Sequence, residues 1–221
     1  MISSPQFIDN SCRFCSLTSS TSSELWNEPL ISDGSVTVVP TKGAIVSPWL
    51  LLIPQSHVPT ASLLPINEKR SVSRLICHLR RLASATGQHL IIFENGSPYF
   101  GADISCGIDH VHIHIVALSF NLVQKLQTRL PEISGEYAPW SPHTKNLNCP
   151  YIYFDDGIRQ YYFDASSAPS QFLRQLIAEM AGHPKKFHYD TFPNIENVIL
   201  TAKWFEKASS AISIATAGTL S

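Results

Sequence analysis

The chain has 221 residues, of which 44% are hydrophobic and 10% aromatic, so it can bury a sizeable core. Its formal net charge of −1 provides no basic stripe for a nucleic acid. No apolar stretch approaches the ~20 residues of a membrane span, and the N-terminus lacks the features of a signal peptide. We therefore expect a cytoplasmic protein that binds a small molecule, with no nucleic-acid partner and no membrane.

The first motif in the chain is a C-x-x-C, Cys12-Arg-Phe-Cys15. On its own this spacing fits a zinc site, a redox pair or chance, and a zinc site needs two more ligands from elsewhere. The chain has five cysteines, an odd number, and no secretion signal. We therefore expect reduced thiols or metal ligands rather than a framework of disulfides.

Four segments of regular structure are predicted in the first hundred residues. Residues 34–39 are rich in β-branched side chains and end at a proline, which indicates a strand, and residues 49–53 and 89–94 predict two more apolar strands. Between the strands at residues 49–53 and 89–94, apolar residues recur at three- and four-residue spacing from Asn67. This spacing predicts a long helix that ends near Gly87.

The strongest functional signal lies in residues 108–116. His110, His112 and His114 alternate with aliphatic residues, so a strand here places all three imidazoles on one face and an apolar row on the other. One histidine on a half-buried strand is usually a packed core residue. Three in strict alternation indicate a site, because buried imidazoles without partners are costly. The residues alone fit either a metal site or a nucleophile.

The run His110-Val-His112-Ile-His114-Ile-Val116 resembles the signature of the histidine triad (HIT) superfamily, whose members hydrolyse or transfer nucleotides at the α-phosphate. The resemblance implies that His112 is the nucleophile, forming a covalent nucleotidyl intermediate, and that His114 donates to phosphate oxygens. Galactose-1-phosphate uridylyltransferase relatives carry glutamine at the third position. A histidine there favours the hydrolase branches.

In zinc-containing HIT proteins, a C-x-x-C, a histidine just after an I-P-x-x-H strand end and the first triad histidine complete a metal site. The matching residues here are Cys12, Cys15, His57 and His110. The resemblance therefore implies a closed, structural Zn²⁺ site that ties the N-terminal loop to the sheet.

The same resemblance implies a set of substrate-binding residues. Thr41 stands where many members have an acidic residue that grips the ribose, which argues against an ordinary ribonucleotide. Asn95 belongs to an Asn-Gly turn expected near the phosphate. Gly107 occupies a position that is often serine or threonine, and its backbone N–H can still face a phosphate oxygen. Ser105 or Cys106 are the alternatives that could replace the missing side chain.

About a hundred residues follow the triad. Residues 150–164 predict a β-hairpin about an Asp-Asp-Gly turn, and helices are predicted from Pro169 to Met180 and from about Asn194 to Lys207. Residues 208–221 are small and are expected to form a disordered tail. Three polar side chains of this part could reach a ligand, although solvent exposure is the simpler expectation for each: Arg159, Arg174 and His188.

We therefore predict an α+β protein. Residues 1–119 form a HIT-like catalytic domain with an antiparallel sheet of about five strands and a long helix, and residues 120–207 form an extension, a hairpin and two helices, packed on it. A homodimer is a further expectation from the family. The predicted activity is that of a hydrolase or nucleotidyl transferase with a phosphoramidate, dinucleoside polyphosphate or nucleotidyl-ester substrate. Two alternatives stay open: a catalytic metal held by the triad histidines, and a non-catalytic nucleotide sensor.

Overall fold

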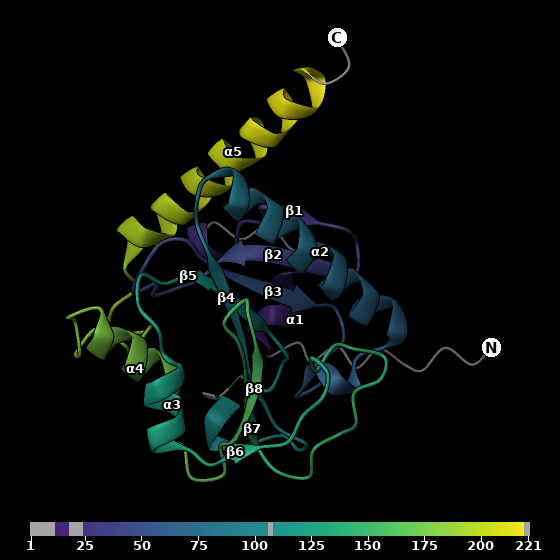
Figure 1. The fold of residues 1–221 in the computed structure, drawn as a ribbon, viewed down its shortest axis with the longest axis vertical. Helices are drawn as coiled ribbons and strands as arrows, with labels where there is room; N and C mark the ends of the chain where they lie inside the picture. The colour runs from purple at the N-terminus through teal and green to yellow at the C-terminus, as the bar shows by residue number, and fades with distance from the viewer. Residues whose placement is uncertain (1–11, 18–23, 106–107, 219–221) are drawn as a thin grey trace.

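The computed structural model describes residues 12–17, 24–105 and 108–218, and its fold is α+β (Figure 1). Within these residues, eight antiparallel strands form one open sheet in the order β1-β2-β3-β5-β4-β7-β8-β6, accompanied by five α-helices. The strands are β1 (Ile31–Ser32), β2 (Val36–Pro40), β3 (Trp49–Pro54), β4 (Leu90–Gly96), β5 (Ile113–Ala117), β6 (Glu132–Ile133), β7 (Tyr151–Asp155) and β8 (Gln160–Asp164). The helices are α1 (Arg13–Leu17), α2 (Ile66–Ala85), α3 (Val123–Arg129), α4 (Phe172–Met180) and α5 (Ile195–Gly218).

The histidine strand β5 lies in the middle of the sheet, between β3 and β4. His114 pairs with Leu51 of β3 on one side and with Phe93 of β4 on the other. Directly paired residues point to the same face of a sheet, as do residues two positions apart on one strand. His114 therefore shares its face with Trp49 in β3 and Asn95 in β4.

The opposite face of the sheet forms a core with α2 and α5. Val111, Ile113 and Ile115, which alternate with the histidines, belong to one buried cluster with the apolar side of α2, a helix close to the one predicted from the sequence. In Figure 1, α2 crosses in front of β2 and β3. Burial of these aliphatic side chains anchors the strand, so the histidines face the other way.

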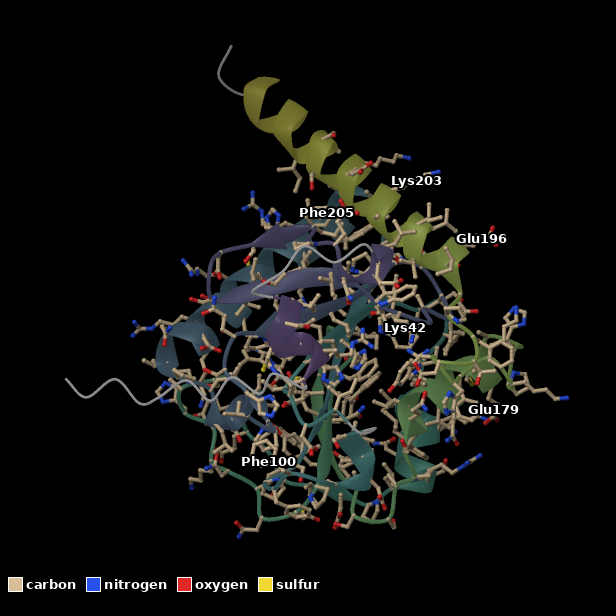
Figure 2. The ribbon with its side chains drawn as sticks, turned by 180° about the vertical axis from the view of Figure 1, so that it is seen from behind. Lys42, Phe100, Glu179, Glu196, Lys203 and Phe205 are labelled. Atoms are coloured by element: carbon tan, nitrogen blue, oxygen red, sulfur yellow. The ribbon has the colours of Figure 1, made fainter. Side chains whose placement is uncertain are left out.

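Shorter helices lie on the histidine face. Phe14 and Leu17 of α1 are buried with side chains of β2 and β3, whereas α3 and α4 cover the part of the sheet formed by β4, β7 and β8. Figure 2, seen from behind, shows α1 near the centre of this face and α4 to one side, with Lys42 labelled between them. The face between α1 and α4 is where the candidate site lies.

The predicted C-terminal hairpin forms and extends the sheet. β7 pairs with β4 from Asp155 opposite Ile92 to Tyr151 opposite Gly96, and with β8 on its other side. Together with the short strands β1 and β6, which were not predicted, the hairpin gives a sheet of eight strands rather than about five. The physical reason is that the hairpin satisfies the edge of β4 with backbone hydrogen bonds instead of packing as a separate layer.

The histidine strand is shorter than predicted, because β5 begins at Ile113 rather than at residue 108. Backbone carbonyl groups near its start accept hydrogen bonds from imidazole rings instead of from the backbone of a neighbouring strand. The carbonyl of Pro54 accepts a hydrogen bond from the ring of His110, and the carbonyl of His110 accepts one from the ring of His112.

The end of the chain also differs from the expectation. α5 continues to Gly218, although a disordered tail was expected from residue 208. Ala208 is fully buried in the core beside α2, and the residues after it include alanines and no proline. The small side chains that suggested disorder are compatible with a helix because alanine is the best helix former. Residues 219–221 lie outside the described residues.

Candidate functional site

The four predicted metal ligands come together in one cluster. The ligand atoms of Cys12, Cys15, His57 and His110 all lie within 4.8 Å of one another. Nδ1 of His110 is 3.6 Å from Sγ of Cys12 and 3.4 Å from Sγ of Cys15, and Nδ1 of His57 is 3.3 Å from Sγ of Cys15. A tetrahedral ion with metal–sulfur bonds of about 2.3 Å and metal–nitrogen bonds of about 2.0–2.1 Å separates such atoms by about 3.5 Å. The cluster therefore fits a four-coordinate metal ion.

Hydrogen bonding prepares His110 as a ligand. Its Nε2–H donates to the carbonyl of Pro54 at 2.8 Å, which leaves the lone pair on Nδ1, the nitrogen that faces the thiols. Burial, with smaller effects from His57 and His112, lowers the pKa of His110 to about 4. The ring is thus neutral at pH 7, as a metal ligand must be. Four protein ligands would fill the coordination sphere, which is typical of structural sites.

His112 lies beside this cluster and is not part of it. Its Nδ1–H donates to the backbone carbonyl of His110 at 2.9 Å, so Nε2 carries the lone pair. Burial, to which the nearby guanidinium of Arg13 adds, lowers the pKa of His112 to about 4. A neutral imidazole with a lone pair on Nε2 can act as a nucleophile near neutral pH.

His114 is held in the opposite tautomer. The indole N–H of Trp49 donates to Nδ1 of His114 at 3.0 Å, and because indole is a donor only, the proton of the neutral ring must lie on Nε2. The ring of Phe93 stacks on the ring of His114, with the two ring centroids 4.3 Å apart. Burial, followed by the charges of His112 and Arg174, lowers the pKa of His114. His114 thus offers an N–H donor beside His112, whose ring centroid is 5.0 Å away.

Both histidines line a cavity that α1 and the C-terminal part of the chain help to form. The cavity has a volume of about 50 Å³, enough for a few water molecules or for a group the size of a phosphate. Three cationic side chains line it, those of Arg13, Lys42 and Arg174. Within the described residues, no acidic side chain does. The cavity is therefore suited to an anion.

The C-terminal part of the chain completes this cavity. Arg174 of α4 is only 6% exposed, and its guanidinium donates to the carbonyls of Phe187 and Gly43. The same group lies 5.0 Å from the ring centre of Trp49. The N–H of Gly43 donates to the carbonyl of Pro193 at 2.9 Å. The loop after β2 is therefore bound both to α4 and to the segment before α5.

Two of the five predicted substrate-binding residues line the cavity. Thr41 is 3% exposed, and neither its Oγ1 nor Oδ1 of Asn95 has a hydrogen-bond partner among the described residues. Buried polar atoms usually have a partner, so these two oxygens indicate where a ligand or water binds. Asn95 lies in strand β4, paired with Ile152 of β7, and not in the Asn-Gly turn that was expected there. Substrate binding by Thr41 and Asn95 stays a prediction.

The other three predicted residues precede the triad. Ser105 does not line the cavity; its Oγ lies 2.7 Å from the carbonyl of Ala102 and 2.8 Å from a carboxylate oxygen of Asp109. The Ser105 hydroxyl thus links two parts of the loop before the histidines instead of facing the cavity. Cys106 and Gly107 lie outside the described residues.

Some lining residues were only partly anticipated or were missed. Arg174 was named as a side chain that could reach a ligand, but solvent exposure was the simpler expectation; exposure is wrong because α4 packs Arg174 under the loop that contains Gly43. Arg13 and Phe14 are the two middle residues of the C-x-x-C motif, so their proximity to His112 follows once the cysteines bind beside His110. For Tyr189, no pattern in the sequence points to the site.

The arrangement combines a nucleophilic imidazole, a neighbouring N–H donor and a cation-lined cavity with a separate cluster of metal ligands. No protein-family model matches the chain, and no curated protein matches its sequence. Among the described residues, none of the helices is long and apolar enough to cross a membrane.

Proposed function

We propose that the protein is a HIT-type nucleotide hydrolase or nucleotidyl transferase that acts at the α-phosphate of a nucleoside phosphate derivative. The observation that carries this proposal is the pair of opposite tautomers. His112 is oriented with its lone pair on Nε2, and His114 with its proton on Nε2, by fixed partners in a cavity of cationic side chains. A phosphate group needs this combination of nucleophile and donors.

In the first step, Nε2 of His112 attacks the α-phosphorus and the bond from phosphorus to the leaving group breaks. The leaving group departs with the electron pair, and the ring becomes cationic while its Nδ1–H stays bonded to the carbonyl of His110. The N–H of His114 and the cationic side chains stabilise the non-bridging oxygens. In the second step, water or another acceptor attacks phosphorus, the P–N bond breaks, and neutral His112 returns as a proton is released.

We further propose that the metal of the Cys12, Cys15, His57 and His110 cluster is Zn²⁺ and that its role is structural. Two thiolates and two imidazoles are a common zinc donor set, and four protein ligands leave no position for water. When bound, the ion would fix α1 to the sheet, and with it Arg13 and Phe14 at the cavity. The first triad histidine then serves the metal, and the chemistry falls to His112 and His114.

The metalloenzyme alternative is less well supported. It needs two or three triad histidines around one ion, whereas the group of metal-ligating side chains among the described residues includes only His110 of the three. His112 and His114 each have a separate hydrogen-bond partner that sets their tautomer. A non-catalytic sensor would not need the lone pair of His112.

The test is intact-protein mass spectrometry at neutral pH after brief incubation with adenosine and guanosine phosphoramidates, dinucleoside polyphosphates and a nucleotide sugar. Wild type should gain the mass of one nucleotidyl group, and His112→Asn should not. His183→Asn is the control: it makes the same substitution at an exposed histidine and should retain the adduct. An absence of both adduct and product from wild type across this panel would refute the proposed function.

A further inference from the structure

Two cations from different parts of the chain lie over one aromatic ring in the cavity, that of Tyr189. Nζ of Lys42 lies 5.6 Å from the centre of this ring and the guanidinium of Arg174 lies 5.8 Å from it. A third cation, the guanidinium of Arg13, lies 5.0 Å from the ring centre of Phe14, another cavity residue. All four of Arg13, Lys42, Arg174 and Tyr189 line the same cavity as the two histidines.

These cations have different surroundings. Arg174 is buried, fixed by backbone carbonyls and close to His114. Lys42 lies nearer to solvent; its Nζ pairs with a carboxylate oxygen of Asp190 at 2.7 Å and lies 5.4 Å from the ring centre of Trp26. Asp190 has a side chain that is 57% exposed. Arg13, on α1, lines the cavity together with His112. The positive charges thus range from a buried guanidinium near His114 to an ammonium group that is partly exposed to solvent.

This charge distribution discriminates between leaving groups. An amine leaving group must take up a proton as it departs, and it becomes a cation at neutral pH. His114 is a poor acid for this step, because the indole of Trp49 occupies its Nδ1 and keeps the ring neutral. A phosphate leaving group needs no proton; its negative charge needs cations. Arg13 and Lys42 supply those.

We propose that Arg13 and Lys42, supported by Tyr189, form a subsite for an anionic leaving group, so that the substrates are nucleoside phosphoanhydrides rather than phosphoramidates. This inference rests on the proposed function. The bond that breaks is the one from the α-phosphorus to a bridging oxygen, and the departing phosphate takes the electron pair as an oxyanion. The products of the full reaction are a nucleoside monophosphate and a phosphate-terminated leaving group.

The ion pair between Lys42 and Asp190 provides a test, because substitutions of its two members should change the affinity for an anion in opposite directions. Removing the lysine charge with Lys42→Met should weaken binding of an anion, whereas Asp190→Asn should strengthen it, because the carboxylate competes with the anion for Lys42. If the pair only stabilises the fold, both substitutions should weaken binding.

The first measurement is calorimetric binding of inorganic pyrophosphate, which does not depend on turnover. We expect Lys42→Met to raise Kd at least fivefold, Asp190→Asn to lower it, and Lys203→Met to leave it unchanged. Lys203 is an exposed lysine on α5, shown in Figure 2 away from Lys42. Equal Kd values for Lys42→Met and wild type, or weaker binding in both pair variants, would overturn the subsite.

The second measurement compares kcat/KM for diadenosine tetraphosphate and adenosine 5′-phosphoramidate, with the guanosine pair in parallel. Lys42→Met should reduce kcat/KM at least tenfold for the phosphoanhydride and less than threefold for the phosphoramidate. Equal reductions would overturn the inference while a His112 adduct still supported the proposed function. Loss of the adduct with every substrate, alongside pyrophosphate binding that depends on Lys42, would refute the function and leave an anion site.

Discussion

The indole N–H of Trp49 donates a 3.0 Å hydrogen bond to Nδ1 of His114, and the two residues lie on adjacent strands of the sheet. Trp49 is fully buried, so no water competes for this bond. The bond decides which nitrogen of His114 carries the proton, and it holds the ring against Phe93. A residue outside the histidine motif therefore sets the chemistry of the third histidine.

Trp49→Phe should disturb His114 without removing its side chain. Loss of the indole N–H leaves a buried nitrogen without a partner, so we expect a stability loss of about 1–3 kcal/mol and a reduction in kcat of about tenfold or more. Nitrogen-15 NMR should show the Nε2–H tautomer of His114 in wild type and a mixture in the variant. Trp204→Phe is the control, since Trp204 donates instead to Thr86, the residue that follows α2. An Nδ1–H tautomer in wild type would contradict the assignment.

Cys15→Ser should remove the metal and destabilise the protein. Because the metal would hold α1 against the sheet, its loss removes a large part of the ~5–15 kcal/mol by which domains are stable. We expect metal content, measured by mass spectrometry of the native protein, to fall from about one ion per chain towards zero, with a clear fall in Tm. Cys77→Ser changes an exposed thiol on α2 and should alter neither. Unchanged metal content in Cys15→Ser would remove this assignment.

Gly43→Ala should open the cavity from the C-terminal side. Gly43 has a φ of +70°, and a Cβ there would lie 2.7 Å from Cα of Tyr189. Gly34 has a φ of +84° but nothing within 4 Å of such a Cβ, so Gly34→Ala carries only the backbone cost of about 1 kcal/mol. We expect Gly43→Ala to lose about 1–3 kcal/mol more in urea unfolding and to bind pyrophosphate more weakly. Similar losses in both variants would contradict the close packing of Tyr189.

A buried carboxyl group on the other side of the sheet should make stability depend on pH. Glu94 is 1% exposed, accepts a hydrogen bond from the N–H of Ala61 at 2.7 Å, and lies 3.1 Å from the hydroxyl of Tyr151. Burial raises its pKa from 4.5 to about 7. The folded protein therefore binds more protons than the unfolded chain between these values, so its stability falls as pH rises through this window.

Glu94→Gln should flatten this dependence. The amide resembles the protonated acid, so the free energy of unfolding of the variant should change less between pH 5 and pH 7.5 than that of wild type. The difference between the two changes should be on the order of 2–3 kcal/mol at most. Chemical denaturation at several pH values measures this difference. Glu206→Gln, which changes an exposed carboxylate on α5, should keep the wild-type profile. If the free energy of unfolding of Glu94→Gln depended on pH as steeply as that of wild type, other groups would cause the dependence.

Local patterns in the sequence predicted much of the fold, because they depend on neighbours in the chain. The apolar spacing of α2, the aromatic hairpin of β7 and β8, and the alternation of His110, His112 and His114 with buried aliphatic residues all appear in the structure. The alternation also implied that β5 has a functional face. It did not reveal that β5 starts at Ile113, since imidazole bonds to backbone carbonyls compete there with strand pairing.

The sequence by itself determined which residue types could do chemistry: paired cysteines, a triad of histidines, and the residues that match them in a known family. Only the tertiary structure decided how these residues are used. Trp49 sets the tautomer of His114, and Arg174 and Tyr189 reach the cavity from more than fifty residues beyond the triad. The physical reason is that hydrogen-bond partners and charges act through space, so their effects follow the packing of β3, α4 and α1 around β5 rather than any spacing along the chain.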